Sequence, residues 1–106
     1  MANLRVLLVE DDEDNRELMA EVLETSGCDV VSASNGQEGL ARLAEGGIDV
    51  VVTDVGMPGM GGLELAKAVR AAAPRVAIVV VTGWAERDDI AAARGNNLLA
   101  IGRTRR

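Results

Sequence analysis

The chain has 106 residues, of which 48% are hydrophobic, and a formal net charge of −6 at pH 7. This size and composition predict one soluble globular domain, and the acidic charge argues against direct binding to nucleic acid. The longest apolar run is too short to cross a bilayer and the single cysteine excludes an internal disulfide, so we expect a cytoplasmic protein without membrane contact. Because the chain has no histidine, a bound metal should be a hard ion held by oxygen atoms.

Apolar runs and turn residues divide the chain into alternating strands and helices. Five apolar segments predict strands, and four stretches with helical spacing of apolar residues predict helices. The strands are expected at residues 4–9, 30–31, 50–54, 76–81 and about 98–101, and the helices before Gly27, after Ser34 or Asn35, through Leu63, Ala66 and Val69, and over about 85–94. This order predicts a single α/β domain over residues 1–106, with a doubly wound parallel sheet.

The third strand has four β-branched residues, Val50 to Thr53, and ends on Asp54. A run of this kind is typical of a strand that is buried on both faces of a parallel sheet. The loop that follows is rich in Gly and Pro, so Asp54 lies at the carboxyl edge of the sheet, where sites form in open α/β folds. Asp also caps turns, and this stretch alone does not separate the two roles.

Other polar residues end neighbouring strands. If the first, third and fourth strands are adjacent, then Glu10, Asp11, Asp54 and Thr82 come together at one edge. Three clustered carboxylates repel one another unless a cation joins them, and Mg²⁺ prefers such oxygen ligands. The alternative for this acid run is a helix N-terminus, the role that we expect for residues 12–14.

These residues resemble the receiver domain of two-component response regulators. The resemblance lies in three segments of this chain, which are Leu-Leu-Val-Glu-Asp-Asp at 7–12, Asp-Val-Gly-Met-Pro-Gly-Met-Gly-Gly at 54–62 and Val-Val-Thr-Gly at 80–83. They occur in the family's order and with similar spacing. The resemblance implies a flavodoxin-like sheet of five strands in the order 2-1-3-4-5.

The same resemblance implies a phosphoryl-accepting signalling domain. Asp54 would accept a phosphoryl group from a phosphohistidine of a sensor histidine kinase. Glu10, Asp11, Asp54 and the main-chain carbonyl of Gly56 would hold Mg²⁺, and Thr82 would hydrogen-bond the phosphoryl oxygens. The domain would be regulatory rather than a separate enzyme, although able to catalyse its own phosphorylation and dephosphorylation.

The chain departs from the family in its last residues. The family's Lys after the fifth strand is missing, and residues 95–106 form an atypical tail. Residues 94–106 contain four Arg, among them Arg103, Arg105 and Arg106, and no acid. The family's last helix is also missing, which would leave one face of the sheet uncovered. Because monomers rarely tolerate large apolar patches, we expect a homo-oligomer through that face, such as a dimer.

The sequence suggests two alternative functions. A degenerate receiver-like module could bind partners without phosphorylation, and the missing Lys and last helix favour this alternative. The other alternative is a hydrolase with an Asp nucleophile, of the haloacid dehalogenase type. Such a hydrolase requires a second acidic residue two positions after the nucleophile. Gly56 occupies that position, so we discount the hydrolase.

Overall fold

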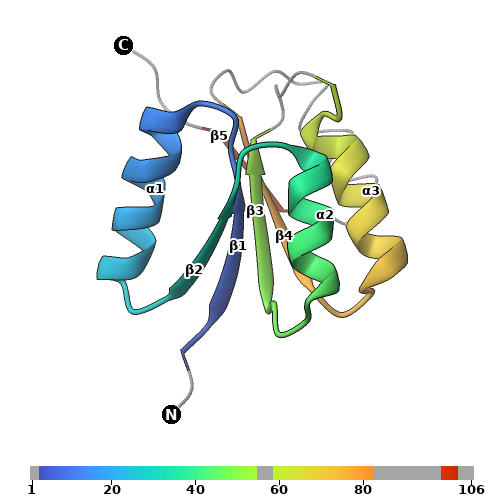
Figure 1. The fold of residues 1–106 in the computed structure, drawn as a ribbon, viewed down its shortest axis with the longest axis horizontal. Helices are drawn as coiled ribbons and strands as arrows, with labels where there is room; N and C mark the ends of the chain where they lie inside the picture. The colour runs from blue at the N-terminus through green and yellow to red at the C-terminus, as the bar shows by residue number, and fades with distance from the viewer. Residues whose placement is uncertain (1–2, 55–58, 83–98, 103–106) are drawn as a thin grey trace.

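The protein folds into a parallel sheet with helices on both faces (Figure 1). The computed structural model describes residues 3–54, 59–82 and 99–102, with side chains for all of these except 82 and 99–102. The elements in chain order are β1 (Arg5–Val9), α1 (Glu13–Thr25), β2 (Asp29–Ala33), α2 (Gly36–Ala44), β3 (Val50–Asp54), α3 (Gly62–Ala72), β4 (Ala77–Thr82) and β5 (Leu99–Gly102). Among these described elements, no helix is long and apolar enough to cross a membrane.

The five strands have the order β2-β1-β3-β4-β5, and every neighbouring pair is parallel. This arrangement confirms the expected α/β class and the flavodoxin-like strand order. The register places Val9 beside Thr53, and Asp54 beside Val81. The carboxyl ends of the three central strands therefore lie level with one another at one edge of the sheet.

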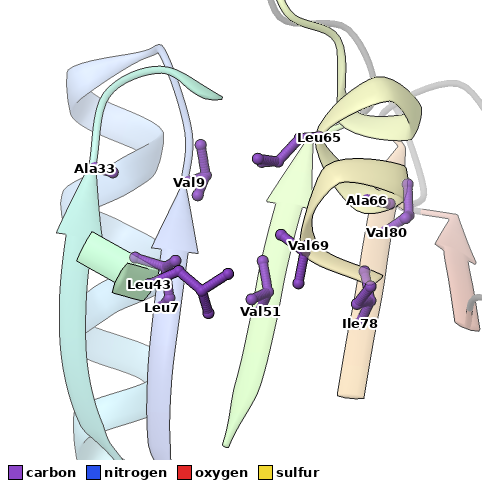
Figure 2. Close-up of a cluster of buried hydrophobic side chains, with 10 residues drawn as sticks. All are labelled: Leu7, Val9, Ala33, Leu43, Val51, Leu65, Ala66, Val69, Ile78 and Val80. Carbon is purple, nitrogen blue, oxygen red and sulfur yellow. The ribbon is translucent and has the colours of Figure 1, made fainter. Parts of the chain in front are cut away.

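The face of the sheet beneath α2 and α3 holds the larger hydrophobic cluster (Figure 2). Leu65, Ala66 and Val69 from α3 pack toward β3 and β4, and Leu43 from α2 lies beside Leu7 of β1. We call this the α2/α3 cluster; its members are Leu7, Val9, Ala33, Leu43, Val51, Leu65, Ala66, Val69, Ile78 and Val80. It positions β1 and β3 side by side and so fixes where their ends lie.

Helix α1 lies on the opposite face (Figure 1) and packs mainly against β2 and β1. Its first residue follows Asp12, whose side chain accepts a hydrogen bond from the N–H of Asp14 at 3.3 Å. Asp12, Glu13 and Asp14 therefore serve the helix N-terminus, as predicted. Helix α2 begins after Asn35, whose Oδ1 accepts from the N–H of Glu38 at 2.8 Å, which selects Asn35 over Ser34 as the cap.

Some details of the elements differ from the sequence-based expectations. Strand β2 runs over five residues because it pairs along its length with β1, whereas only Val30 and Val31 had the expected composition. Helix α3 buries Leu65 completely, and the predicted core residue Leu63 is only partly buried at the edge of the cluster. The predicted fourth helix and the expected lack of a last helix concern residues 83–98 and 103–106, which lie outside the described residues.

Candidate functional site

Three carboxylates meet at the carboxyl edge of the sheet. Glu10 and Asp11 follow the last residue of β1, and Asp54 ends the neighbouring strand β3. Because Val9 pairs with Thr53, Glu10 and Asp54 are each the next residue along adjacent parallel strands. One carboxylate oxygen from each of the three residues lies within 4.8 Å of the other two. The structure thus brings together three of the acids that the sequence placed at this edge.

Glu10 is the most deeply buried of the three acids, with 1% of its surface exposed. Its Oε2 accepts a hydrogen bond from the N–H of Asp12 at 3.1 Å. Its Oε1 is buried and has no hydrogen-bond partner among the described residues. A buried carboxylate oxygen without a partner costs free energy, so this atom is suited to a ligand from outside the chain.

The electrostatics of the cluster disfavour three negative charges. Burial raises the pKa of the Glu10 carboxyl, and the neighbouring Asp11 carboxyl and the charge of Asp54 raise it further. The hydrogen bond from the N–H of Asp12 acts in the opposite direction and lowers this pKa. The net shift is upward, so the site prefers to take up a positive charge, whether a proton or a metal ion.

The donor set fits a hard divalent cation. Asp11 is exposed and Asp54 is half-buried, so the oxygens of the cluster range from the interior to solvent. Mg²⁺ binds one or two protein carboxylates and keeps several waters, which requires such an open side. The partnerless Oε1 of Glu10 and the mutual approach of the carboxylates therefore match the Mg²⁺ that the sequence led us to expect.

The other two predicted site residues are placed less fully. Thr82 is the last residue of β4, one position beyond the partner of Asp54, and so lies at the same edge of the sheet. Its side chain is not described. Gly56, the expected source of a main-chain carbonyl, lies outside the described residues. Their roles in the site stay predictions.

Sequence reasoning missed the contacts that hold Glu10 in position. Arg16, in the first turns of α1, donates from its Nη1 to the main-chain carbonyl of Glu10 at 3.0 Å. On the other side, the N–H of Glu10 donates to the carbonyl of Ala33 at the end of β2, at 3.1 Å. Contacts to main-chain atoms leave no compositional signal; the only available hint was a lone basic residue in an acidic helix.

A family model described as the response regulator receiver domain matches residues 6–98. A response regulator receiver protein of Anaeromyxobacter sp. (strain Fw109-5) is 41% identical over 97 residues, which cover 92% of this chain and 41% of that protein. The response regulator receiver protein CpdR of Brucella abortus is 38% identical over 81 residues, which cover 76% of this chain and 68% of the relative. The chain thus spans less than half of the first relative.

Solved structures agree with these sequence matches. The response regulator TrrA of Thermotoga maritima in complex with Mg²⁺-BeF has a TM-score of 0.85 and 29% identity, with 95% of this chain and 87% of that chain covered. A chain in the structure of the histidine kinase ThkA in complex with TrrA has a TM-score of 0.83 and 28% identity, covering 95% of this chain and 86% of that one.

Proposed function

Because the chain belongs to the response regulator receiver domain family, we propose that it accepts a phosphoryl group on Asp54 in a Mg²⁺-dependent reaction. The observation that carries this proposal is the cluster of three carboxylates at the level ends of β1 and β3, with one oxygen of Glu10 buried and without a described partner. This arrangement costs stability in the protein alone and is suited to a cation.

Asp54 is the acceptor because of its position. It is half-buried, so one carboxylate oxygen can meet a donor from solvent while β3 fixes the main chain. Thr53, the preceding residue, is fully buried and donates from Oγ1 to the carbonyl of Asp54 at 3.2 Å, which limits rotation of the strand end. The Asp54 oxygen bonds to phosphorus as the bond between phosphorus and the donor nitrogen breaks.

Glu10, Asp11 and Asp54 would hold the Mg²⁺ ion, together with the main-chain carbonyl of Gly56. A cation held there would supply positive charge beside the carboxylates and the phosphoryl oxygens, so that two negatively charged groups could approach. Glu10 contributes through its buried oxygen, and its carbonyl and N–H are tied to Arg16 and Ala33, which keeps it from turning away. Asp11 is exposed and would leave a bound cation accessible to water.

A sensor histidine kinase is the proposed phosphoryl donor. The likeness to a chain in the ThkA–TrrA complex supports such a partner, since that structure contains a histidine kinase with a response regulator.

The missing Lys after the fifth strand favours a second candidate, a receiver-like module that binds partners without phosphorylation. The only Lys of the chain, Lys67, is exposed on α3 and is not part of the carboxylate cluster. A site without the Lys ammonium group would accept a phosphoryl group slowly or not at all, because less positive charge faces the incoming phosphoryl group.

Incubation with acetyl phosphate, followed by intact-mass spectrometry, separates the two candidates. We expect one phosphoryl group per chain with Mg²⁺, and none with a chelator in excess. Asp54→Asn should abolish the adduct, whereas Asp29→Asn, a matched change at the start of β2, should retain it. A folded wild-type protein that gains no adduct would favour the interaction module, and an adduct on Asp54→Asn would place the acceptor elsewhere.

A further inference from the structure

Arg16 is the single basic residue in the acidic segment over residues 10–29. It lies near the N-terminus of α1, where the helix dipole disfavours a cation, so the stability of the helix does not explain its presence. Within residues 3–54, all of which the structure describes, Arg16 forms no ion pair with the acids of α1. Its guanidinium instead donates from Nη1 to the main-chain carbonyl of Glu10, at 3.0 Å.

Helix geometry explains how Arg16 reaches a residue six positions earlier in the chain. Side chains on a helix tilt toward its N-terminus, so the long side chain of Arg16 can pass back along the first turn of α1. Strand β1 ends at Val9, and the carbonyl of Glu10 therefore lies beyond the paired residues of the strand. The half-buried Arg16 supplies this main-chain oxygen with a donor.

The bond from Arg16 is one of three that fix Glu10. The N–H of Glu10 donates to the carbonyl of Ala33 at 3.1 Å, and its Oε2 accepts from the N–H of Asp12 at 3.1 Å. These bonds hold the residue while a carboxylate oxygen lies close to those of the other two acids. Only the bond from Arg16 comes from a side chain, so it is the one that a substitution at another residue can remove.

Glu38 of α2 helps to keep the Arg16 side chain at this edge. The hydrogen bonds from the N–H and the Oγ of Ser34 lower the pKa of Glu38 most, and the charges of Arg42 and Arg16 lower it further. The Arg16 guanidinium is thus near enough to Glu38 for attraction between the two charges. Since Ser34 fixes the Glu38 carboxylate, this attraction favours a guanidinium that stays beside the end of β1.

We propose that Arg16 is a positioning residue for the metal site, because it holds the main chain of Glu10 and so keeps the Glu10 carboxylate in place for a divalent cation. This inference rests on the Mg²⁺ site of the proposed function. Its sign separates it from a simple effect of charge. A nearby cation repels Mg²⁺, so removal of the Arg16 charge alone would tighten binding, whereas loss of a residue that orients a metal ligand weakens binding.

The test is isothermal titration calorimetry of the 106-residue chain with Mg²⁺, which measures the dissociation constant of the metal. Arg16→Met keeps an apolar stem but removes the charge and the donor. It should raise the dissociation constant by about tenfold, the lower end of the range for residues that orient metal ligands. Arg16→Lys retains a charge and a donor, and its dissociation constant should stay within about threefold of the wild type.

Two controls separate position from charge and from folding. Arg42→Met removes the same charge from an exposed residue of α2, and should change the dissociation constant by less than about twofold. The weakening by Arg16→Met should persist at high ionic strength, because salt screens an effect of charge but not one of geometry. Melts in chelator check that Arg16→Met folds, which we expect because its side chain still covers the half-buried position.

The possible failures are distinguishable. A folded wild type that binds no Mg²⁺ would overturn the metal site and this inference together. If the wild type binds Mg²⁺, equal or tighter binding by Arg16→Met would overturn the role of Arg16 and leave the metal site intact. A loss in Arg16→Lys as large as that in Arg16→Met would also overturn this role, since a retained charge and donor would not have preserved binding.

Discussion

The α2/α3 cluster and the acidic end of the same strands both contain buried groups but differ in how those groups are satisfied. In β1, Val9 is 0% exposed and the next residue, Glu10, is 1% exposed. Val9 packs within the cluster, while Glu10 holds a buried oxygen without a described partner and lies close to two other carboxylates. Burial stabilises the first residue and raises the pKa of the second.

At the acidic end, repulsion between the carboxylates lowers the stability of the metal-free protein, whereas the apolar cluster stabilises it. The apolar cluster keeps β1 and β3 in register, and that register holds the acids together. Substitutions in the cluster should therefore destabilise the protein, whereas removal of charge at the acidic end should stabilise the metal-free protein.

The largest effect is expected in the cluster. Leu65→Ala should lower the free energy of unfolding by about 2–5 kcal/mol, because Leu65 is fully buried and its truncation leaves a cavity. Urea denaturation measures this change. The matched variant Leu18→Ala, at a 60% exposed position on α1, should cost less than about 1 kcal/mol. Equal costs for the two variants would contradict the assignment of Leu65 to the core and of Leu18 to the surface.

Metal binding should offset the loss of stability that the clustered carboxylates cause. At ten times its dissociation constant, Mg²⁺ should add about 1.4 kcal/mol to the free energy of unfolding, if it binds only the folded state. Thermal melts with added Mg²⁺ and with a chelator measure this gain. Glu10→Gln should reduce it strongly, and Asp29→Asn should leave it unchanged. A wild-type melting temperature that does not respond to millimolar Mg²⁺ would argue against the site.

Much of the fold and the positions of the clustered acids could be predicted from the sequence, because they depend on local patterns of residues. The β-branched run before Asp54 indicated a buried strand, and the order of strands and helices indicated a doubly wound sheet. Once the strand order was correct, Glu10, Asp11 and Asp54 had to lie at one edge. The acids at the start of α1 also indicated their capping role.

Other features depend on packing between distant segments and could not be predicted. Helical spacing placed Leu63 with Ala66 and Val69 on the inner side of α3, whereas Leu65 is fully buried with those two residues and Leu63 is only partly buried. The side of the helix that faces the sheet depends on how α3 packs, which the spacing alone does not determine. The partnerless oxygen of Glu10 and the bond from Arg16 to its carbonyl depend on side-chain rotamers and on main-chain positions. Residues 83–98, where the fourth helix was expected, lie outside the described residues.

A smaller effect of opposite sign to Leu65→Ala is expected at Asp54. In the absence of metal, Asp54→Asn should raise the free energy of unfolding by about 1 kcal/mol or less, since it removes one charge close to Glu10 and Asp11. Urea denaturation in the presence of a chelator measures this gain. In saturating Mg²⁺ the order should invert, because the wild type binds the ion more tightly. A loss of stability in both conditions would mean that Asp54 serves the fold.

The smallest effects should appear in the pH dependence, where Glu10 and Glu38 are expected to act in opposite directions. Glu38 lies near the same edge, and its Oε1 accepts from the N–H and the Oγ of Ser34 at 2.6 and 2.8 Å. These bonds hold the pKa of Glu38 below its usual 4.5, so it stabilises the folded state above that pH. Glu38→Gln should cost about 0.5–1 kcal/mol at pH 7, and this cost should vanish as the pH falls below 4.5.

For Glu10 the sign is reversed. Its pKa is raised above 4.5 in the folded state, so between the two values the folded protein binds more protons than the unfolded chain. The metal-free wild type should therefore gain stability as the pH falls from neutral through the raised pKa toward 4.5, and Glu10→Gln should lack this gain. Chemical denaturation over this pH range, in chelator, measures both variants against the wild type. If Glu10→Gln and Glu38→Gln changed the pH profile in the same direction, the two carboxylates would not differ in the way that the burial of Glu10 and the hydrogen bonds of Glu38 indicate.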